Sequence, residues 1–328
     1  MPKGPNDKWT SVTPKEAIAT TKGRPVPDFP IEFEWHTGPW EDIFDNQVKL
    51  IREDIARARA EERLVVYLSC PISSRGGGYS GTNVDIAKFA ERALLQRWGE
   101  GFWILNPAQY QLESKAGTGL IQRHAQELEI DLDDLRRKSN PDGGSAVPGG
   151  GDYMRMWTRV LAMDQPPLGL EPHDAKLVDT GQHFDAFYFV GPRDVQAFFA
   201  EEGSLTAGIQ TYFARQFATN AAFRDYFSVP GICWGPNAGT AQPDLRSDWE
   251  RKRLDFFRYY GLRASGNFSL GSHDEWNIFC LINEKRRRAT VGPGHLDGDI
   301  SVQLAGFFDG GQLDPGSTEM KISRGYAV

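Results

Sequence analysis

One segment constrains the fold more than any other, because it joins two apolar runs through a glycine-rich loop and an amphipathic helix. Residues 64–70 (LVVYLSC) are rich in β-branched and aromatic side chains, which is typical of a buried strand in a parallel sheet. Residues 83–98 carry apolar side chains at helical spacing, and residues 101–105 (GFWIL) read as a second strand. This order predicts a βαβ unit, and therefore an α/β protein.

The remaining sequence divides into a core and three additions to it. We expect an N-terminal arm (residues 1–45), the first part of an α/β core (46–190), a helical insertion (191–262), the last part of the core (263–290) and a C-terminal tail (291–328). A third core strand is predicted at residues 184–190 (FDAFYFV), and the tail contains one candidate strand at 300–308. We therefore predict a three-layer α/β fold with a mostly parallel, flavodoxin- or Rossmann-like sheet.

Composition and charge exclude several classes of protein. The formal charge of −7 argues against a nucleic-acid polymer as partner, because such proteins usually present a basic face. Cys70, Cys233 and Cys280 are too few and too widely spaced for a disulfide framework, and no CxxC pair suggests zinc. No run approaches the roughly 20 apolar residues that span a bilayer. The N-terminus also lacks the apolar core of a secretion signal. We therefore expect a cytoplasmic protein without a membrane partner or a metal.

The glycine-rich loop, residues 71–81 (PISSRGGGYSG), follows the first predicted strand. In open α/β sheets, ligands bind beyond the carboxyl ends of the strands. Glycines let backbone N–H groups approach an anion, and the following helix adds the positive end of its dipole. The alternative is a plain flexible connection, since the loop is neither a Walker loop nor a GxGxxG motif. The expected phosphate-binding residues of this loop are Ser73, Ser74, Arg75, Gly76 and Gly77.

A second polar loop leads into a helix predicted at residues 273–288. The loop and the first turn read Ser269-Leu270-Gly271-Ser272-His273-Asp274-Glu275. Serines at a helix N-terminus cap the helix or hold an anion, and the helix dipole favours an ionised carboxylate in the first turn. We expect Glu275 to be ionised at neutral pH and suited to nucleophilic attack on a sugar carbon. The alternative is a capping box, because Ser272 and Glu275 match its S-x-x-E spacing.

The order of these motifs resembles the nucleoside 2-deoxyribosyltransferase superfamily. The resemblance begins with the strand and loop of residues 64–77 and continues to Asn106-Pro107-Ala108. The loop also resembles that of the 2′-deoxynucleoside 5′-phosphate N-hydrolases. The segment Tyr153-Met154-Arg155 is similar to one in phage-type members, and residues 184–190 resemble the family's Asp-Ala plus apolar strand. The stretch from Ser269 to Glu275 resembles the family motif S-x-G-x-x-x-E.

The resemblance implies an N-glycosidic bond hydrolase or a deoxyribosyltransferase that acts on a nucleotide or nucleoside. In that family the glutamate of the last motif is the nucleophile, and the serine contacts the substrate phosphate. The resemblance therefore implies that Glu275 is the nucleophile and that Ser269 and Gly271 belong to the phosphate-binding site. The intermediate is a covalent glycosyl-glutamate, and no cofactor is needed. Family members often assemble so that a neighbour completes the site, so a homo-oligomer is compatible with the resemblance. Candidate contacts to the base or sugar are Asp152, Tyr153 and Trp157.

Two departures from the family pattern keep other functions open. Trp157 stands where the family usually places an aspartate, and residues 191–268 separate two motifs that normally lie close together. A rival alignment uses residues 204–210 and places Gln210 at the nucleophile position, where an amide cannot attack. That alignment implies a non-catalytic nucleotide-binding sensor or regulatory module. A third interpretation is an NAD-cleaving effector on a related core, which also uses one glutamate.

Overall fold

A five-stranded sheet with the strand order β4-β3-β5-β6-β7 lies at the centre of the molecule. The computed structural model describes residues 9–12, 33–72, 77–112, 117–139, 148–162, 183–228, 243–266, 270–289 and 303–314. The strands are β3 (Leu64–Ser69), β4 (Phe102–Leu105), β5 (Ala186–Phe189), β6 (Ala305–Phe308) and β7 (Gly311–Gln312). The first four are parallel, and β7 turns back antiparallel to β6. This confirms the predicted α/β fold with a mostly parallel, Rossmann- or flavodoxin-like sheet.

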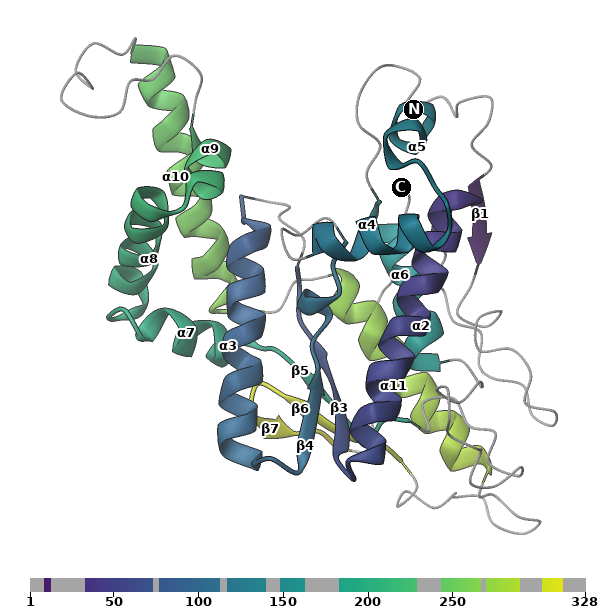
Figure 1. Ribbon diagram of the computed structural model, residues 1–328. Coiled ribbons are helices and arrows are strands. Elements are labelled where there is room, and N and C mark those ends of the chain that lie inside the picture. The colour runs from purple at the N-terminus through teal and green to yellow at the C-terminus, as the bar shows by residue number, and fades with distance from the viewer. Residues whose placement is uncertain are drawn as a thin grey trace.

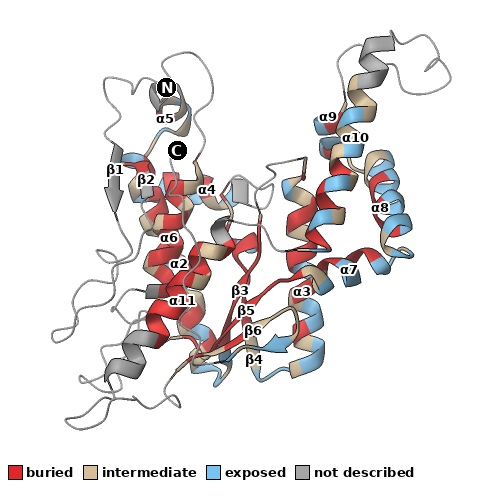
Figure 2. Cartoon of the chain, turned by 180° about the vertical axis from the view of Figure 1, so that it is seen from behind, coloured by how far each residue is buried: buried red, intermediate tan, exposed pale blue. Residues whose placement is uncertain are grey.

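Helices cover both faces of this sheet and make three layers (Figure 1). Side chains alternate along β3, so Val65 and Tyr67 join one apolar cluster while Val66 and Leu68 join another. The first cluster includes α2 (Pro39–Ala60), α6 (Gly150–Ala162) and α11 (Leu270–Ala289). The second includes α3 (Ser80–Trp98), α7 (Pro192–Ala200), α8 (Leu205–Thr219), α9 (Ala221–Phe227) and α10 (Pro243–Arg263). Figure 2 shows the buried residues gathered in the sheet and in the helix faces turned toward it.

The N-terminal arm is shorter than predicted. Helix α2 begins at Pro39 rather than near residue 46. Proline suits the first helical position because its missing N–H has no partner there in any case. Trp40, Ile43 and Phe44 then continue the buried stripe of the helix. Before α2, β1 (Trp9–Val12) and β2 (Phe33–His36) form a separate antiparallel pair.

The described residues between 191 and 262 form α7, α8, α9 and most of α10, and none of them is in a strand. These helices pack against one another through aromatic rings, for example Phe213 against Phe256 at a centroid distance of 5.1 Å. In Figure 1, α8, α9 and much of α10 rise above the level of the sheet, whereas α7 lies lower, beside α3. The helices α4 (Gly117–Glu127) and α5 (Leu132–Ser139), which follow a short 3₁₀ helix at Pro107–Gln109, lie toward the other side of the molecule.

The segment assigned to a C-terminal tail supplies a strand of the core, which corrects the predicted boundary at residue 291. Residues 305–308 form β6, which pairs with the whole of β5. The reason is the apolar run Leu304–Phe308, which is partly removed from water when it joins the sheet: Leu304 and Gly306 are buried, and the other three residues are partly buried. Gly306 lets the strand lie close to α11, because a Cβ there would come within 2.6 Å of the Phe279 ring.

The chain changes direction at β3. It leaves β3 through α3 on one face and reaches β4, then returns through α6 on the other face to reach β5. The carboxyl ends of β3 and β5 are therefore a topological switch point, where Ser69 lies opposite Phe189. Ligands of open α/β sheets bind outside such a point. In the described part of the chain, no helix is long and apolar enough to cross a membrane.

Candidate functional site

Glu275 lies against the carboxyl end of β3, at the switch point of the sheet. It is the sixth residue of α11 and only 6 % exposed. The hydroxyl of Tyr67 donates to Oε1 at 2.7 Å, and the hydroxyl of Ser69 donates a short hydrogen bond to Oε2. Tyr67 and Ser69 are two apart on β3, so both face the α11 side of the sheet. Ser272 lies inside α11 rather than at its N-cap, so the capping-box alternative is wrong.

The protonation of Glu275 differs from the expectation. Burial raises the pKa of its carboxyl to about 7, although hydrogen bonds from Ser69 and Tyr67 oppose the rise. The charge of Asp274 adds to the rise. The helix dipole favours the ionised form, but its effect is smaller than that of removing a carboxylate from water. Glu275 is therefore near the midpoint of its titration at pH 7, a state suited to a group that changes its bonding during a reaction.

The base of the glycine-rich loop is held by α3 and α10. The side-chain amide of Asn83 donates to the Ile72 carbonyl at 3.1 Å. The Tyr260 hydroxyl lies 3.0 Å from both Asn83 Oδ1 and the Tyr79 carbonyl, and Arg263 donates to Asn83 Oδ1 at 3.2 Å and to the Pro71 carbonyl at 3.5 Å. The inserted helices therefore reach the site through the end of α10.

The glycines at the end of the loop have a packing role. Gly77 has φ +103°, and a Cβ on it would lie 2.8 Å from the Asp255 carbonyl oxygen of α10. A Cβ on Gly78 would lie 2.5 Å from the Tyr259 ring. Close approach to α10 thus requires glycine at both positions, whether or not an anion binds. Of the other predicted phosphate-binding residues, Ser73, Ser74, Arg75, Gly76 and Ser269 lie outside the described residues, and Gly271 is the second residue of α11.

The predicted base and sugar contacts already have protein partners. Asp152, which is 2 % exposed, accepts from the His36 N–H at 2.9 Å and lies 3.1 Å from the His36 ring nitrogen Nδ1. The Gly149 N–H also donates to this carboxylate at 2.9 Å. Asp152 therefore ties the N-terminal arm to the start of α6.

Two aromatic residues of α6 continue this packing. The Tyr153 hydroxyl accepts from the Leu112 N–H at 2.9 Å. Trp157 is 5 % exposed, and its ring lies 5.7 Å from that of Tyr67 and 6.2 Å from that of Tyr110. Trp157 thus supports the ring of Tyr67, whose hydroxyl holds Glu275. Any part that Asp152, Tyr153 or Trp157 takes in binding a ligand stays a prediction.

Gln210, the residue of the rival alignment, is exposed on α8. Its neighbours Ile209 and Tyr212 are buried in the cluster on the α3 side of the sheet. Glu275 instead contacts the end of β3 from the opposite face. Gln210 and Glu275 therefore lie on opposite sides of the sheet, and only Glu275 contacts the end of β3.

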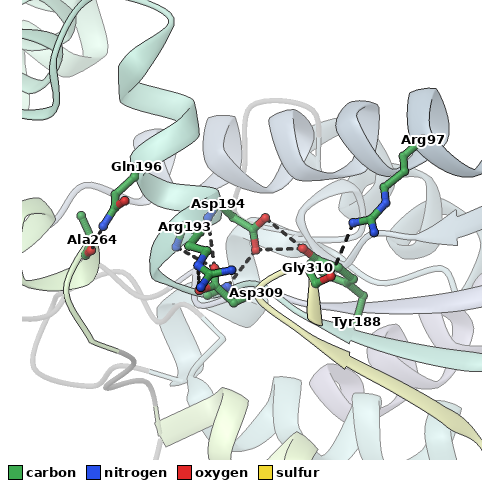
Figure 3. A network of polar contacts seen from close by, with 9 residues as sticks. Arg97, Tyr188, Arg193, Asp194, Gln196, Ala264, Asp309 and Gly310 are labelled. Atoms are coloured by element: carbon green, nitrogen blue, oxygen red, sulfur yellow. Dashed lines mark hydrogen bonds and ion pairs between the residues drawn. The ribbon is translucent and has the colours of Figure 1, made fainter. Parts of the chain in front are cut away.

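A second polar network lies at the carboxyl ends of β5 and β6 (Figure 3). The carboxylate of Asp309 accepts from the N–H groups of Arg193 and Asp194 at 2.6 and 3.2 Å, at the start of α7. Asp194 accepts from the Tyr188 hydroxyl at 2.9 Å and from the Gly191 N–H at 2.9 Å. Burial raises the pKa of the Asp194 carboxyl. The N-terminus of α7 is thus neutralised by acids of the chain itself.

Three residues of the site were not singled out from the sequence. Tyr67 and Ser69 could have been found, because strand alternation places them on one face just before the loop. Arg263 gave no signal, since its role depends on where α10 lies. Among the described residues, no group of three or more His, Cys, Asp or Glu side chains is placed to hold a metal ion. Comparison of the chain with protein-family models, with curated proteins and with solved structures gave no match.

Proposed function

We propose that this protein cleaves or transfers the N-glycosidic bond of a nucleotide or nucleoside, with Glu275 as the nucleophile. The observation that carries the proposal is a buried carboxylate at the switch point of the sheet, held by hydroxyl donors on both oxygens. These two hydroxyl donors fix the orientation of the Glu275 side chain, and they add no positive charge that would neutralise the carboxylate. The site lies where ligands of open α/β sheets bind.

The reaction follows from the chemistry of a carboxylate. One oxygen of Glu275 attacks the anomeric carbon, the carbon–nitrogen bond breaks, and the base leaves with the electron pair and takes up a proton from solvent. Water then attacks the same carbon, loses a proton and releases the carboxylate, so the sugar keeps its configuration. In a transferase, a second base replaces the water.

The pKa of about 7 sets the pH dependence of this reaction. Only the ionised carboxylate attacks, so the rate rises as the pH increases from 6 to 8 and then levels off. Burial of Tyr67 and its contact with Glu275 raise the pKa of its hydroxyl well above the usual value, so Tyr67 stays protonated and remains a donor over this range.

The test is the release of free base. The protein is incubated with 2′-deoxynucleoside 5′-monophosphates, the matching nucleosides and NAD, and the products are separated by chromatography. Glu275→Gln keeps the shape of the side chain but cannot attack, so base release should fall by about 1,000-fold or more. The exposed Glu100→Gln is the matched control and should keep full activity. Full activity in Glu275→Gln would reject the mechanism.

A second candidate function is nucleotide binding without cleavage. It is favoured by Asp152 and Trp157, which contact protein groups at positions where the resemblance expects a substrate. In that case the wild-type protein binds a nucleotide in a calorimetric titration but releases no base at any pH between 5 and 9. Release of nicotinamide from NAD alone would instead favour the effector interpretation.

A further inference from the structure

Arg263 is a buried arginine that forms no ion pair within the described part of the chain. It is 5 % exposed. Its acceptors are neutral: Asn83 Oδ1 at 3.2 Å and the Pro71 carbonyl oxygen at 3.5 Å. Arg155, by comparison, binds the carboxylates of Glu41 and Asp45. A buried charge without a partner is costly, so a fold rarely keeps one unless an ion or ligand completes it.

The helix that Arg263 contacts, α3, has no acidic side chain in its first turn. Asn83, which accepts from Arg263, is the fourth residue of α3, and the N-cap residue Tyr79 makes no side-chain cap hydrogen bond. Asp85, the first acid of the helix, accepts from the Tyr212 hydroxyl. The start of α7 differs, because Asp194 and Asp309 occupy it. The N-terminus of α7 is therefore neutralised by two carboxylates, whereas the first turns of α3 contact the guanidinium of Arg263.

We propose that Arg263, together with the N-terminus of α3, binds the phosphate monoester of the substrate, which makes the substrate a nucleoside 5′-monophosphate rather than a nucleoside. Guanidinium and phosphate form charge-assisted hydrogen bonds, and a helix N-terminus favours an anion. That the phosphate belongs to a nucleotide rests on the proposed function, whereas the binding of phosphate is inferred from the contacts of Arg263 alone.

Both Glu275 and Arg263 contact the end of β3. Ser69, which holds Glu275, and Pro71, which accepts from Arg263, are two residues apart where β3 ends. Arg263 also lies close enough to Cys70, between them, to oppose the rise in pKa that burial causes in its thiol. The nucleophile and the guanidinium thus approach the end of β3 from its two faces. We place one nucleotide across this strand end, with its anomeric carbon toward Glu275 and its phosphate toward Arg263.

The experiment compares ligands with and without phosphate by isothermal titration calorimetry. Wild-type protein should bind inorganic phosphate and bind a 2′-deoxynucleoside 5′-monophosphate more tightly than the matching nucleoside. Arg263→Met should weaken both phosphate ligands by about 10- to 100-fold and leave the nucleoside unchanged, since charge-assisted hydrogen bonds have this strength. Arg258→Met removes an exposed arginine of the same helix and should change neither affinity. Equal affinities for nucleotide and nucleoside in the wild type, or unchanged phosphate binding in Arg263→Met, would overturn the proposal.

Two further readouts separate this role from a structural one. If Arg263 only clamps the loop, phosphate changes the melting temperatures of the wild type and of Arg263→Met alike; if Arg263 binds an anion, phosphate raises the melting temperature of the wild type but not that of the variant. Hydrogen exchange on the wild-type protein needs no variant: phosphate should slow exchange in peptides covering 77–84 and 258–266 but not in α5, and uniform exchange with and without phosphate contradicts the site. Phosphate binding that depends on Arg263 without any base release would reject the glycosidase and leave the anion site standing.

Discussion

At the scale of single residues, the site depends on Glu275, a buried carboxyl group whose ionised form destabilises the fold. Glu275 is buried beside Asp274, and burial raises its pKa from 4.5 to about 7. The folded protein therefore holds a proton that the unfolded chain releases above about pH 4.5. The contribution of Glu275 to stability is fully present below pH 4.5 and is lost as the pH rises through 7. A residue that serves only the fold would not be expected to carry this cost.

We predict that Glu275→Gln is more stable than the wild type at pH 8 and equally stable at pH 5. The amide cannot ionise, so the variant avoids the cost of a buried charge, up to about 3 kcal/mol for this rise in pKa. Urea unfolding at both pH values measures the difference. The exposed Glu100→Gln should be neutral at both. A Glu275→Gln variant that is less stable at pH 8 would show that the charged form supports the fold.

The candidate nucleophile could be predicted from sequence, but its environment could not. Glu275 stood out because a small polar loop precedes its helix, which is a local pattern. Its pKa depends on the hydroxyls of Tyr67 and Ser69 and on its burial, and these follow only from the packing of α11 on β3. Arg263 lay beyond sequence reasoning because its partners Pro71 and Asn83 are far away in the chain.

At the scale of elements, the contact between the glycine-rich loop and α10 positions the site. Gly77→Ala places a Cβ against the Asp255 carbonyl at a residue with φ +103°. We expect it to destabilise the protein by roughly 1–3 kcal/mol, because both the strain and the clash must be relieved. Gly261→Ala is the matched change on α10, since a Cβ there meets nothing within 4 Å. It should stabilise by about 0.5–1 kcal/mol, because alanine favours helix.

Thermal unfolding of both variants tests this assignment. If Gly77→Ala melts like the wild type, the loop does not lie against α10 as described, and α10 has no fixed relation to the site. The strand, loop and helix themselves were predictable because each has a local pattern of apolar residues. The contact of the loop with α10 was not, because residues 77 and 255 meet only in the tertiary structure.

At the scale of the whole molecule, β6 joins the late part of the chain to the centre of the sheet. Gly306→Val would overpack the space filled by the Phe279 ring and should destabilise the protein by about 1–3 kcal/mol. Because β6 pairs with β5, amide exchange in β5 should accelerate as well. Gly311→Ala, at an exposed position of β7, is the control. Unchanged exchange in β5 would contradict the pairing.

The position of β6 near the end of the chain also affects how the protein folds during synthesis in the cell. β5 ends at Phe189 and β6 begins at Ala305, so a growing chain exposes one unpaired edge of β5 while the ribosome translates all the residues between them. Such an edge, with its aromatic run Phe187-Tyr188-Phe189, is a template for pairing with another nascent chain. The first of the inserted helices begins three residues after β5 and is the earliest element available to shield that strand. Yield on overexpression should therefore depend on chaperones and on the rate of translation across residues 190–304.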